Sequence, residues 1–169
     1  MQNSEAEHMP LSFVSHSVQE TNDLGAYCAG FLQDGDVVLL TGDLGAGKTQ
    51  FTQGVGHALD VSENIISPTF NILLIHEGKK HTLHHWDLYR IEHADELIDL
   101  DYFALISTDA ISLVEWGDRF DDTSLDADLA IEFIWLSDQM RRIEIQALSM
   151  RGAHIIGALA GSNQVIDDE

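Results

Sequence analysis

The sequence Val-Val-Leu-Leu-Thr-Gly-Asp-Leu-Gly-Ala-Gly-Lys-Thr at residues 37–49 joins an apolar run to a glycine-rich turn. The four apolar residues at 37–40 are typical of a strand that is covered on both faces of a sheet. The turn after them contains a complete GxxxxGK pattern followed by Thr. In such a loop the backbone N–H groups wrap phosphate groups and the following helix begins beside them. These residues therefore predict a strand, a phosphate-binding P-loop and a helix.

The patterns on either side of this unit alternate between helix and strand. Upstream, a short strand at 11–14 precedes Ser17 and Glu20, which form a capping-box pattern for a helix to about Gln33. Downstream we expect a helix at 48–59, strands at 69–76 and 81–87, short helices within 94–105, a strand at 111–114, a loop at 118–128, and strands at 129–136 and 141–148.

This order of elements predicts an α/β fold of the P-loop NTPase type with three layers. The central sheet is expected to be mostly parallel, with antiparallel hairpin additions at 69–87 and 129–148. The length of 169 residues suits one domain over 1–169. We expect residues 1–10 and 153–169 to be flexible, because the tail after Gly152 mixes small apolar residues with an acidic end.

The cysteine content and the lengths of the apolar runs indicate where in the cell the protein is expected. Cys28 is the single cysteine, so an internal disulfide is excluded and a cytoplasmic location is expected. Cys28 also falls on the apolar stripe of its helix, which favours a buried thiol. The polar, acidic start of the chain does not resemble a secretory signal, and the apolar runs are far shorter than the roughly 20 residues that span a bilayer.

The charge balance disfavours nucleic acid as a direct ligand. Eight Lys and Arg against 29 Asp and Glu give a formal net charge of −21. The field of such a surface repels phosphodiester backbones, so tight binding of tRNA or DNA by this chain alone is not expected. A bound anion must instead be held locally, by backbone N–H groups, a metal ion or one of the few cations.

A P-loop at this position predicts roles for two of its residues and requires an acidic residue nearby. Lys48 would reach the β- and γ-phosphates of a nucleotide, and the Thr49 hydroxyl would ligate Mg²⁺. A carboxylate on a neighbouring strand is also needed for Mg²⁺, and Glu115 and Asp87 each stand where a predicted strand ends. Arg141 and Arg142 begin a predicted strand, and alternation allows at most one of them to face the nucleotide easily.

The aromatic residues of the strands are expected in the core. Trp86 and Trp135 both lie in predicted strands, where a large ring is most often buried.

Four motifs in order, GDLGAGKT at 42–49, SPTF at 67–70, WDLYR at 86–90 and LVEWGDR at 113–119, resemble the TsaE (YjeE) family. That family is the bacterial ATPase required for the threonylcarbamoyladenosine (t6A) modification of tRNA. The similarity extends roughly from residue 17 to residue 148. Many relatives have Pro where this chain has Gly117, so the path of that loop is not fixed by the resemblance.

The resemblance implies a set of site residues and partners. It implies a nucleotide loop made of Gly42, Asp43, Leu44, Gly45, Ala46, Gly47, Lys48 and Thr49. Thr49 and Glu115 match the Mg²⁺ ligands, and Asp87 matches a second essential acid that holds Mg²⁺ through water or orients the attacking water. Thr69 matches a switch threonine, Trp116 a tryptophan beside the metal-binding acid, and Thr21 a segment near the adenine. The implied partners are TsaD and TsaB, with TsaC making the threonylcarbamoyl-AMP that TsaD uses.

Three functions are consistent with these residues. The first is an Mg²⁺-dependent ATPase acting with TsaB and TsaD in t6A formation, with Lys48, Asp87 and Glu115 as catalytic residues. A small-molecule P-loop kinase is a second, although the five arginines are scattered rather than grouped in a lid. A third is a nucleotide-gated binding module with little turnover. A GTPase is disfavoured because the chain has no NKxD motif.

Overall fold

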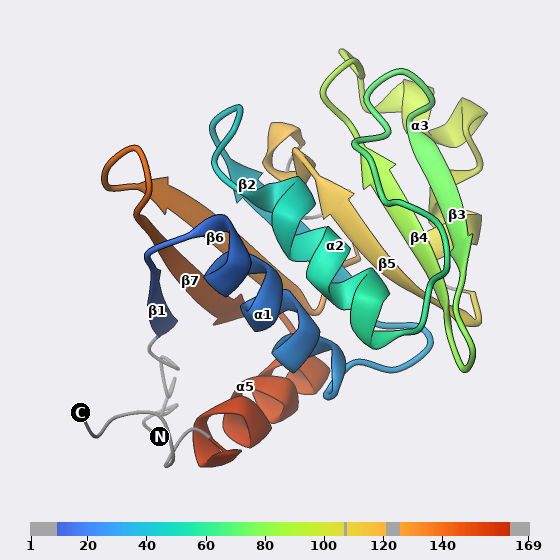
Figure 1. The fold of residues 1–169 in the computed structure, drawn as a ribbon. Helices are drawn as coiled ribbons and strands as arrows, with labels where there is room; N and C mark the ends of the chain where they lie inside the picture. The colour runs from blue at the N-terminus through green and yellow to red at the C-terminus, as the bar shows by residue number, and fades with distance from the viewer. Residues whose placement is uncertain (1–9, 107, 121–125, 163–169) are drawn as a thin grey trace, which may run out of the picture.

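A mixed seven-stranded sheet forms the centre of the computed structural model, which describes residues 10–106, 108–120 and 126–162. The strand order is β1-β7-β6-β2-β5-β4-β3 (Figure 1). The strands are β1 Leu11–Ser15, β2 Val37–Gly42, β3 Leu73–Glu77, β4 Thr82–Asp87, β5 Ala110–Glu115, β6 Leu129–Trp135 and β7 Arg141–Ala147. Strands β4, β5, β2 and β6 pair in parallel, whereas β3–β4, β6–β7 and β1–β7 are antiparallel. The expected α/β class, with a parallel centre and two hairpin additions, is confirmed.

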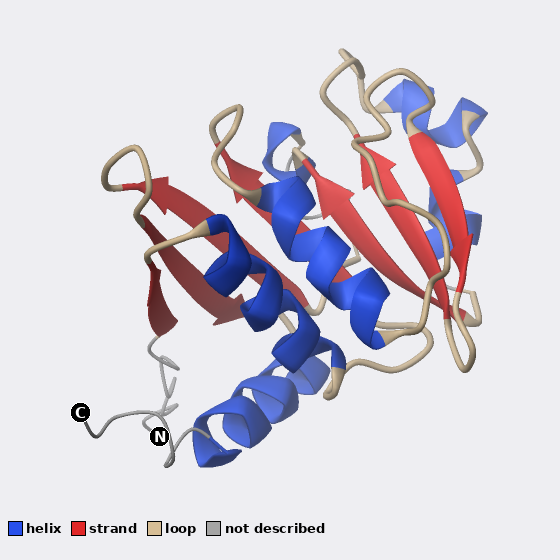
Figure 2. Ribbon diagram, viewed as in Figure 1, coloured by secondary structure: helices blue, strands red, loops and turns tan. Residues whose placement is uncertain are grey.

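Helices cover both faces of this sheet (Figure 2). On one face, helices α1 (Val18–Ala29), α2 (Lys48–Ala58) and α5 (Met150–Ser162) pack on a core that contains Val38 and Leu40. On the other face, the short helices α3 (Asp95–Asp99) and α4 (Tyr102–Ile106) cover a second core that contains Val37 and Leu39. Alternate residues of β2 therefore enter different cores, which explains its uninterrupted apolar run.

Helix α1 begins where the capping pattern predicts but ends early. Ser17 is the N-cap, and its hydroxyl accepts a hydrogen bond from the Glu20 amide at 3.1 Å. The helix ends at Ala29 rather than near Gln33, because the amides of residues 30–32 bond to carbonyls three residues back. The apolar spacing thus continues through a tighter turn than an α-helix.

Strand β3 begins at Leu73, four residues later than the sequence suggests. The carbonyl of Pro68 accepts bonds from the amides of Asn71 and Ile72, and Ile72 has a positive φ of 66°. Residues 68–72 therefore form a turn, and the Thr69 hydroxyl within it bonds to Asp87 at the end of β4.

The segment after Gly152 differs from the flexible tail that we expected. Residues 150–162 form helix α5, and Ile155, Ile156 and Leu159 on it are buried against the core of the α1 and α2 face. Arg151 fixes the start of this helix by a paired contact with Asp36, Nε to Oδ1 at 2.9 Å and Nη2 to Oδ2 at 2.8 Å. Residues 1–9 and 163–169 lie outside the described residues, as do 121–125 of the expected loop at 118–128.

The buried cysteine and one of the two tryptophans are placed as expected. Cys28 is buried, and burial raises the pKa of its thiol to about 12. Trp86 is buried against Tyr102, with ring centroids 4.9 Å apart. The prediction for Trp135 is wrong, since 47% of it is exposed and its ring lies under the guanidinium of Arg141. Trp135 is the last residue of β6, so its ring covers a strand end rather than entering a core.

The helices of the described segments include none that combines the length and the apolar character needed to cross a bilayer.

Removing the Arg151 side chain should destabilise the fold. Arg151→Ala leaves the carboxylate of Asp36, only 2% exposed, without its cation, and we expect a loss of about 2 to 4 kcal/mol in the free energy of unfolding. Arg142→Ala is the matched control, because Arg142 and its partner Glu144 are both partly exposed and such pairs contribute about 0 to 1 kcal/mol. Urea unfolding measures both, and equal losses would contradict the role given to Arg151.

Candidate active site

The glycine-rich loop, residues 42–49, connects the carboxyl end of β2 to the first turn of α2. Gly42 and Gly47 have φ values of 132° and 119°, which side chains rarely tolerate. A Cβ on Gly42 would also lie 2.5 Å from the carbonyl oxygen of Phe133. Gly47 is the N-cap of α2 and provides no side-chain cap, so the first amides of the helix remain available for an anion.

Lys48 is folded back onto this loop. Its Nζ donates to the carbonyl oxygens of Gly42 at 2.6 Å and Asp43 at 2.9 Å, and lies 4.2 Å from the centre of the Trp116 ring. Burial lowers the pKa of Lys48, and this effect is opposed by nearby carboxylates, first that of Glu115. The ammonium group therefore lies next to the loop that would hold phosphate, with backbone carbonyls as its present acceptors.

Glu115 closes the site from the neighbouring strand. It is the last residue of β5, pairs in register with Leu40 of β2 and Asp87 of β4, and is only 3% exposed. Its Oε1 accepts a hydrogen bond from the Thr49 hydroxyl at 3.0 Å and lies 2.8 Å from Nε2 of His85. The predicted pairing of Thr49 with an acid at a strand end is thus present, whereas His85 was not anticipated.

Asp87 lies beside Glu115 and gathers donors from two loops. Its Oδ2 accepts bonds from the hydroxyls of Thr69 at 2.6 Å and Ser67 at 3.1 Å, and its Oδ1 accepts one from the Tyr89 amide at 2.9 Å. The turn at 68–72 makes the Thr69 contact possible. Two residues that are distant in sequence, Thr69 and Asp87, therefore meet at one wall of the same cavity.

Trp116 adopts a left-handed backbone conformation, with φ 62° and ψ 29°, as it leaves β5. Its ring contacts Lys48 on one side and Tyr89, at 5.1 Å between centroids, on another. Gly117 then begins a 3₁₀ turn (Gly117–Arg119) packed on Leu39, where a Cβ would lie 2.7 Å from a methyl carbon of that leucine. This contact defines the path of the loop at Gly117, which the resemblance did not fix.

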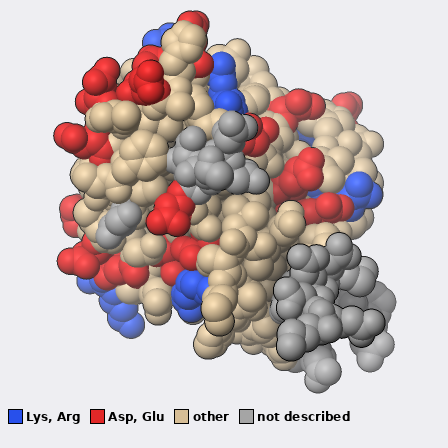
Figure 3. Space-filling model, turned by 180° about the vertical axis from the view of Figure 1, so that it is seen from behind, with Lys and Arg blue, Asp and Glu red and all other residues tan. Residues whose placement is uncertain are grey.

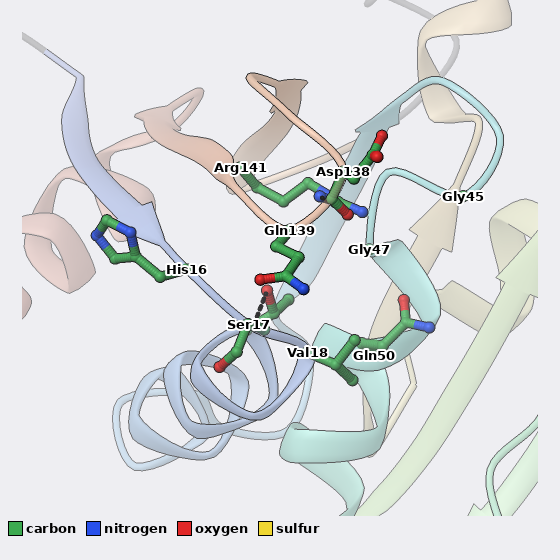
Figure 4. A pocket seen from close by; sticks show the side chains of 10 residues that line it. His16, Ser17, Val18, Gly45, Gly47, Gln50, Asp138, Gln139 and Arg141 are labelled. Atoms are coloured by element: carbon green, nitrogen blue, oxygen red, sulfur yellow. Dashed lines mark hydrogen bonds between the residues drawn. The ribbon is translucent and has the colours of Figure 1, made fainter.

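Two adjoining cavities border the loop. The first has a volume of about 210 Å³ and is lined by Lys48, Thr49, Thr69, Asp87, Glu115 and Trp116, among others. The second, of about 300 Å³, lies between the start of α1, the loop and the β6–β7 turn (Figure 4). Thr21 lines the second cavity, but its hydroxyl is engaged by Ser15 at 2.8 Å. Thr21 therefore forms part of the wall of this cavity, with its hydroxyl already hydrogen-bonded within the protein.

Arg141 and Arg142 have different surroundings, as strand alternation predicts. The Nε of Arg141 donates to the Ala46 carbonyl at 3.0 Å, and Arg141 lines the second cavity. Arg142 instead pairs with Glu144 at 2.9 Å. Of these two, Arg141 is the one that contacts the glycine-rich loop.

The donor set fits a nucleotide with Mg²⁺. A helix start with free amides and a nearby lysine suits phosphate groups. Thr49 and Glu115 supply the hydroxyl and carboxylate oxygens that Mg²⁺ accepts alongside water and phosphate, and Asp87 adds a second carboxylate within the same cavity.

Tryptophan fluorescence should report phosphate binding. When Mg-ADP takes the ammonium group of Lys48 away from the Trp116 ring, we expect a change in emission, since the cation–π contact is lost. Trp116→Phe should abolish the change, and Trp86→Phe should preserve it, because the Trp86 ring is buried against Tyr102 and does not line the phosphate cavity. A change of equal size in the Trp116→Phe protein would contradict this placement of Lys48.

Known proteins resemble the chain along most of its length. The sequence profile of the family described as "Threonylcarbamoyl adenosine biosynthesis protein TsaE" matches residues 15–143. A protein of Treponema pallidum named tRNA threonylcarbamoyladenosine biosynthesis protein TsaE is 33% identical over 132 residues, which are 78% of this chain and 97% of that protein. The Bacillus subtilis protein of the same name is 34% identical over 133 residues, 79% of this chain and 83% of that one.

The fold agrees with a solved relative. The crystal structure of Bacillus subtilis YdiB matches with a TM-score of 0.75 and 28% identity, covering 92% of this chain and 98% of that one. The chain therefore belongs to the TsaE family, whose role is in tRNA threonylcarbamoyladenosine biosynthesis.

Proposed function

We propose that this chain is an Mg²⁺-dependent ATPase that acts with TsaB and TsaD in forming t6A on tRNA. The observation that carries the proposal is the contact between Thr49 and Glu115, which joins the glycine-rich loop to a buried strand-end acid. A hydroxyl and a carboxylate in this arrangement are what a nucleotide-bound Mg²⁺ requires of a P-loop protein. The family role and the relatives' names support the connection to t6A.

Binding would begin at the loop. The amides at the start of α2 receive the phosphates, and Lys48 exchanges the carbonyls of Gly42 and Asp43 for phosphate oxygens. Bound Mg²⁺ would neutralise phosphate charge, with Thr49 and Glu115 holding it. The nucleoside would occupy the second cavity, between Thr21 and Arg141.

In this proposal Asp87 directs water toward the terminal phosphate. Its carboxylate borders the same cavity as Lys48 and Glu115, and hydrogen bonds from three groups fix its orientation. The contact between Thr69 and Oδ2 is the one that must break if Thr69 is to reach a γ-phosphate. That exchange would free an oxygen of Asp87 to accept a bond from the attacking water.

Turnover by the isolated chain should be slow. Among the described residues that line the phosphate cavity, Lys48 is the one cationic side chain. Arg90 and Arg119 stack instead on the rings of Phe70 and Tyr89. A P-loop enzyme without an arginine at the transferring phosphate gains rate when a partner supplies or positions one.

Charge is the reason to assign tRNA contact to the partners. The chain carries a net charge of −21, and acidic side chains are spread over the face seen in Figure 3 with Lys and Arg at separate places between them. Such a surface repels a tRNA backbone. The proposal therefore has TsaB and TsaD hold tRNA while this chain binds nucleotide.

Phosphate release from Mg-ATP tests the proposal. We expect a low rate from the purified chain and a rise of at least about tenfold when TsaB and TsaD from the same organism are both added, because an added cation lowers the barrier. Lys48→Ala is the blank, and Asp87→Asn should retain nucleotide binding but lose the rise. An unchanged rate despite measured ATP binding, with full tRNA modification by Asp87→Asn, would favour the nucleotide-gated module.

A further inference from the structure

His85 is a fully buried polar side chain on the strand that ends at Asp87. It lies on β4 with 0% of its surface exposed, and two residues before it the fully buried Leu83 occupies the same face. Histidine is rarely placed in such surroundings unless its ring nitrogens have a partner. The partner of His85 is Glu115 of the neighbouring strand, at 2.8 Å.

We propose that His85 is a positioning residue that fixes the Glu115 carboxylate in the orientation required for Mg²⁺. This inference rests on the proposed function, since it concerns how the chain prepares the metal-binding acid.

Both hydrogen bonds to the Glu115 carboxylate are made to the same oxygen, Oε1. The Thr49 hydroxyl and Nε2 of His85 lie 3.0 and 2.8 Å from Oε1, and they come from two different elements, α2 and β4. Held at Oε1 from two directions, the carboxylate cannot rotate without losing a bond. This leaves Oε2 for a metal ion or a metal-bound water in the cavity that Glu115 lines.

The tautomer of His85 follows from its surroundings. An ionised carboxylate only accepts hydrogen bonds, so Nε2 must carry the proton that lies between the two groups. Nδ1 is then an acceptor, and it has no partner among the described residues. The contact with Glu115 is therefore assigned as an N–H of His85 donating to the carboxylate.

The ring of a second histidine lies near that of His85. The rings of His76 and His85 lie 6.2 Å apart between centroids, and His76 is itself held by Glu63 at 2.6 Å. Donors outside the metal ligands commonly fix ligand orientation, and their loss typically weakens metal binding about 10- to 100-fold. His85 has the position and the contact for that role.

The test compares three substitutions. His85→Leu removes the donor, whereas His85→Gln retains an amide N–H that reaches about as far as Nε2. His84→Leu is the matched control, because His84 is a buried neighbour on the same strand whose side chain points to the opposite face. The measurements are Mn²⁺ affinity by electron paramagnetic resonance with ADP bound, and the affinity for a fluorescent ADP analogue in EDTA.

We expect His85→Leu to weaken Mn²⁺ binding by about tenfold or more, while nucleotide affinity in EDTA stays within about twofold of the unsubstituted protein. His85→Gln should bind Mn²⁺ within about threefold, and His84→Leu should match the unsubstituted protein. If His85→Leu does not fold, His85→Asn takes its place, because its shorter amide does not reach Glu115. The inference then predicts that His85→Asn binds Mn²⁺ more weakly than His85→Gln does.

Unchanged Mn²⁺ affinity in the donor-free variant would overturn the inference. So would an equal loss of Mn²⁺ affinity and of nucleotide affinity in EDTA, since that result indicates a purely structural role. A lack of metal dependence in the unsubstituted protein would instead overturn the proposed function. The two failures are therefore distinguishable.

Discussion

The parallel register of three neighbouring strands is the constraint on which the site depends. Leu40 of β2 pairs with Glu115 of β5, and Glu115 pairs with Asp87 of β4, so two acids end at the level where the glycine-rich loop begins. Parallel strands present their carboxyl ends at one edge, where α/β proteins bind ligands. A shift of one residue would direct each acid to the opposite face. The two cores on either side of β2 prevent that shift.

The charges of two buried acids and one lysine determine which ligands this site can attract. Glu115 and Asp87 are both buried, and both interact electrostatically with Lys48 in a chain with a net charge of −21. Burial strengthens the attraction of these carboxylates for a cation because water screens them less. In the proposed function a divalent ion would offset the charge of these carboxylates and of a bound nucleotide. The hydroxyls of Ser67 and Thr69 bond to Asp87, and the ring of His85 bonds to Glu115, so each acid is held in place.

The sequence predicted the elements that have a local signature. The loop at 42–49, the N-cap at Ser17 and the acids at the ends of β4 and β5 were all evident from spacing and residue type. Helix α5 was missed because its stability comes from packing of Ile155 and Leu159 and from the Arg151 contact with Asp36, 115 positions away. His85 was missed for the same reason: one histidine among several in 76–93 has no pattern, and its partner is 30 residues away. Its position two residues before Asp87, on the face of Leu83, was the available signal.

A crystal structure with Mg²⁺ and a non-hydrolysable ATP analogue tests the central claim most directly. The account predicts phosphates on the amides at the start of α2, Mg²⁺ about 2.1 Å from the Thr49 hydroxyl with Glu115 as ligand directly or through water, and Lys48 moved from the carbonyls of Gly42 and Asp43 to phosphate. A nucleotide bound elsewhere, with Lys48 still on those carbonyls and no metal at Thr49, would contradict it.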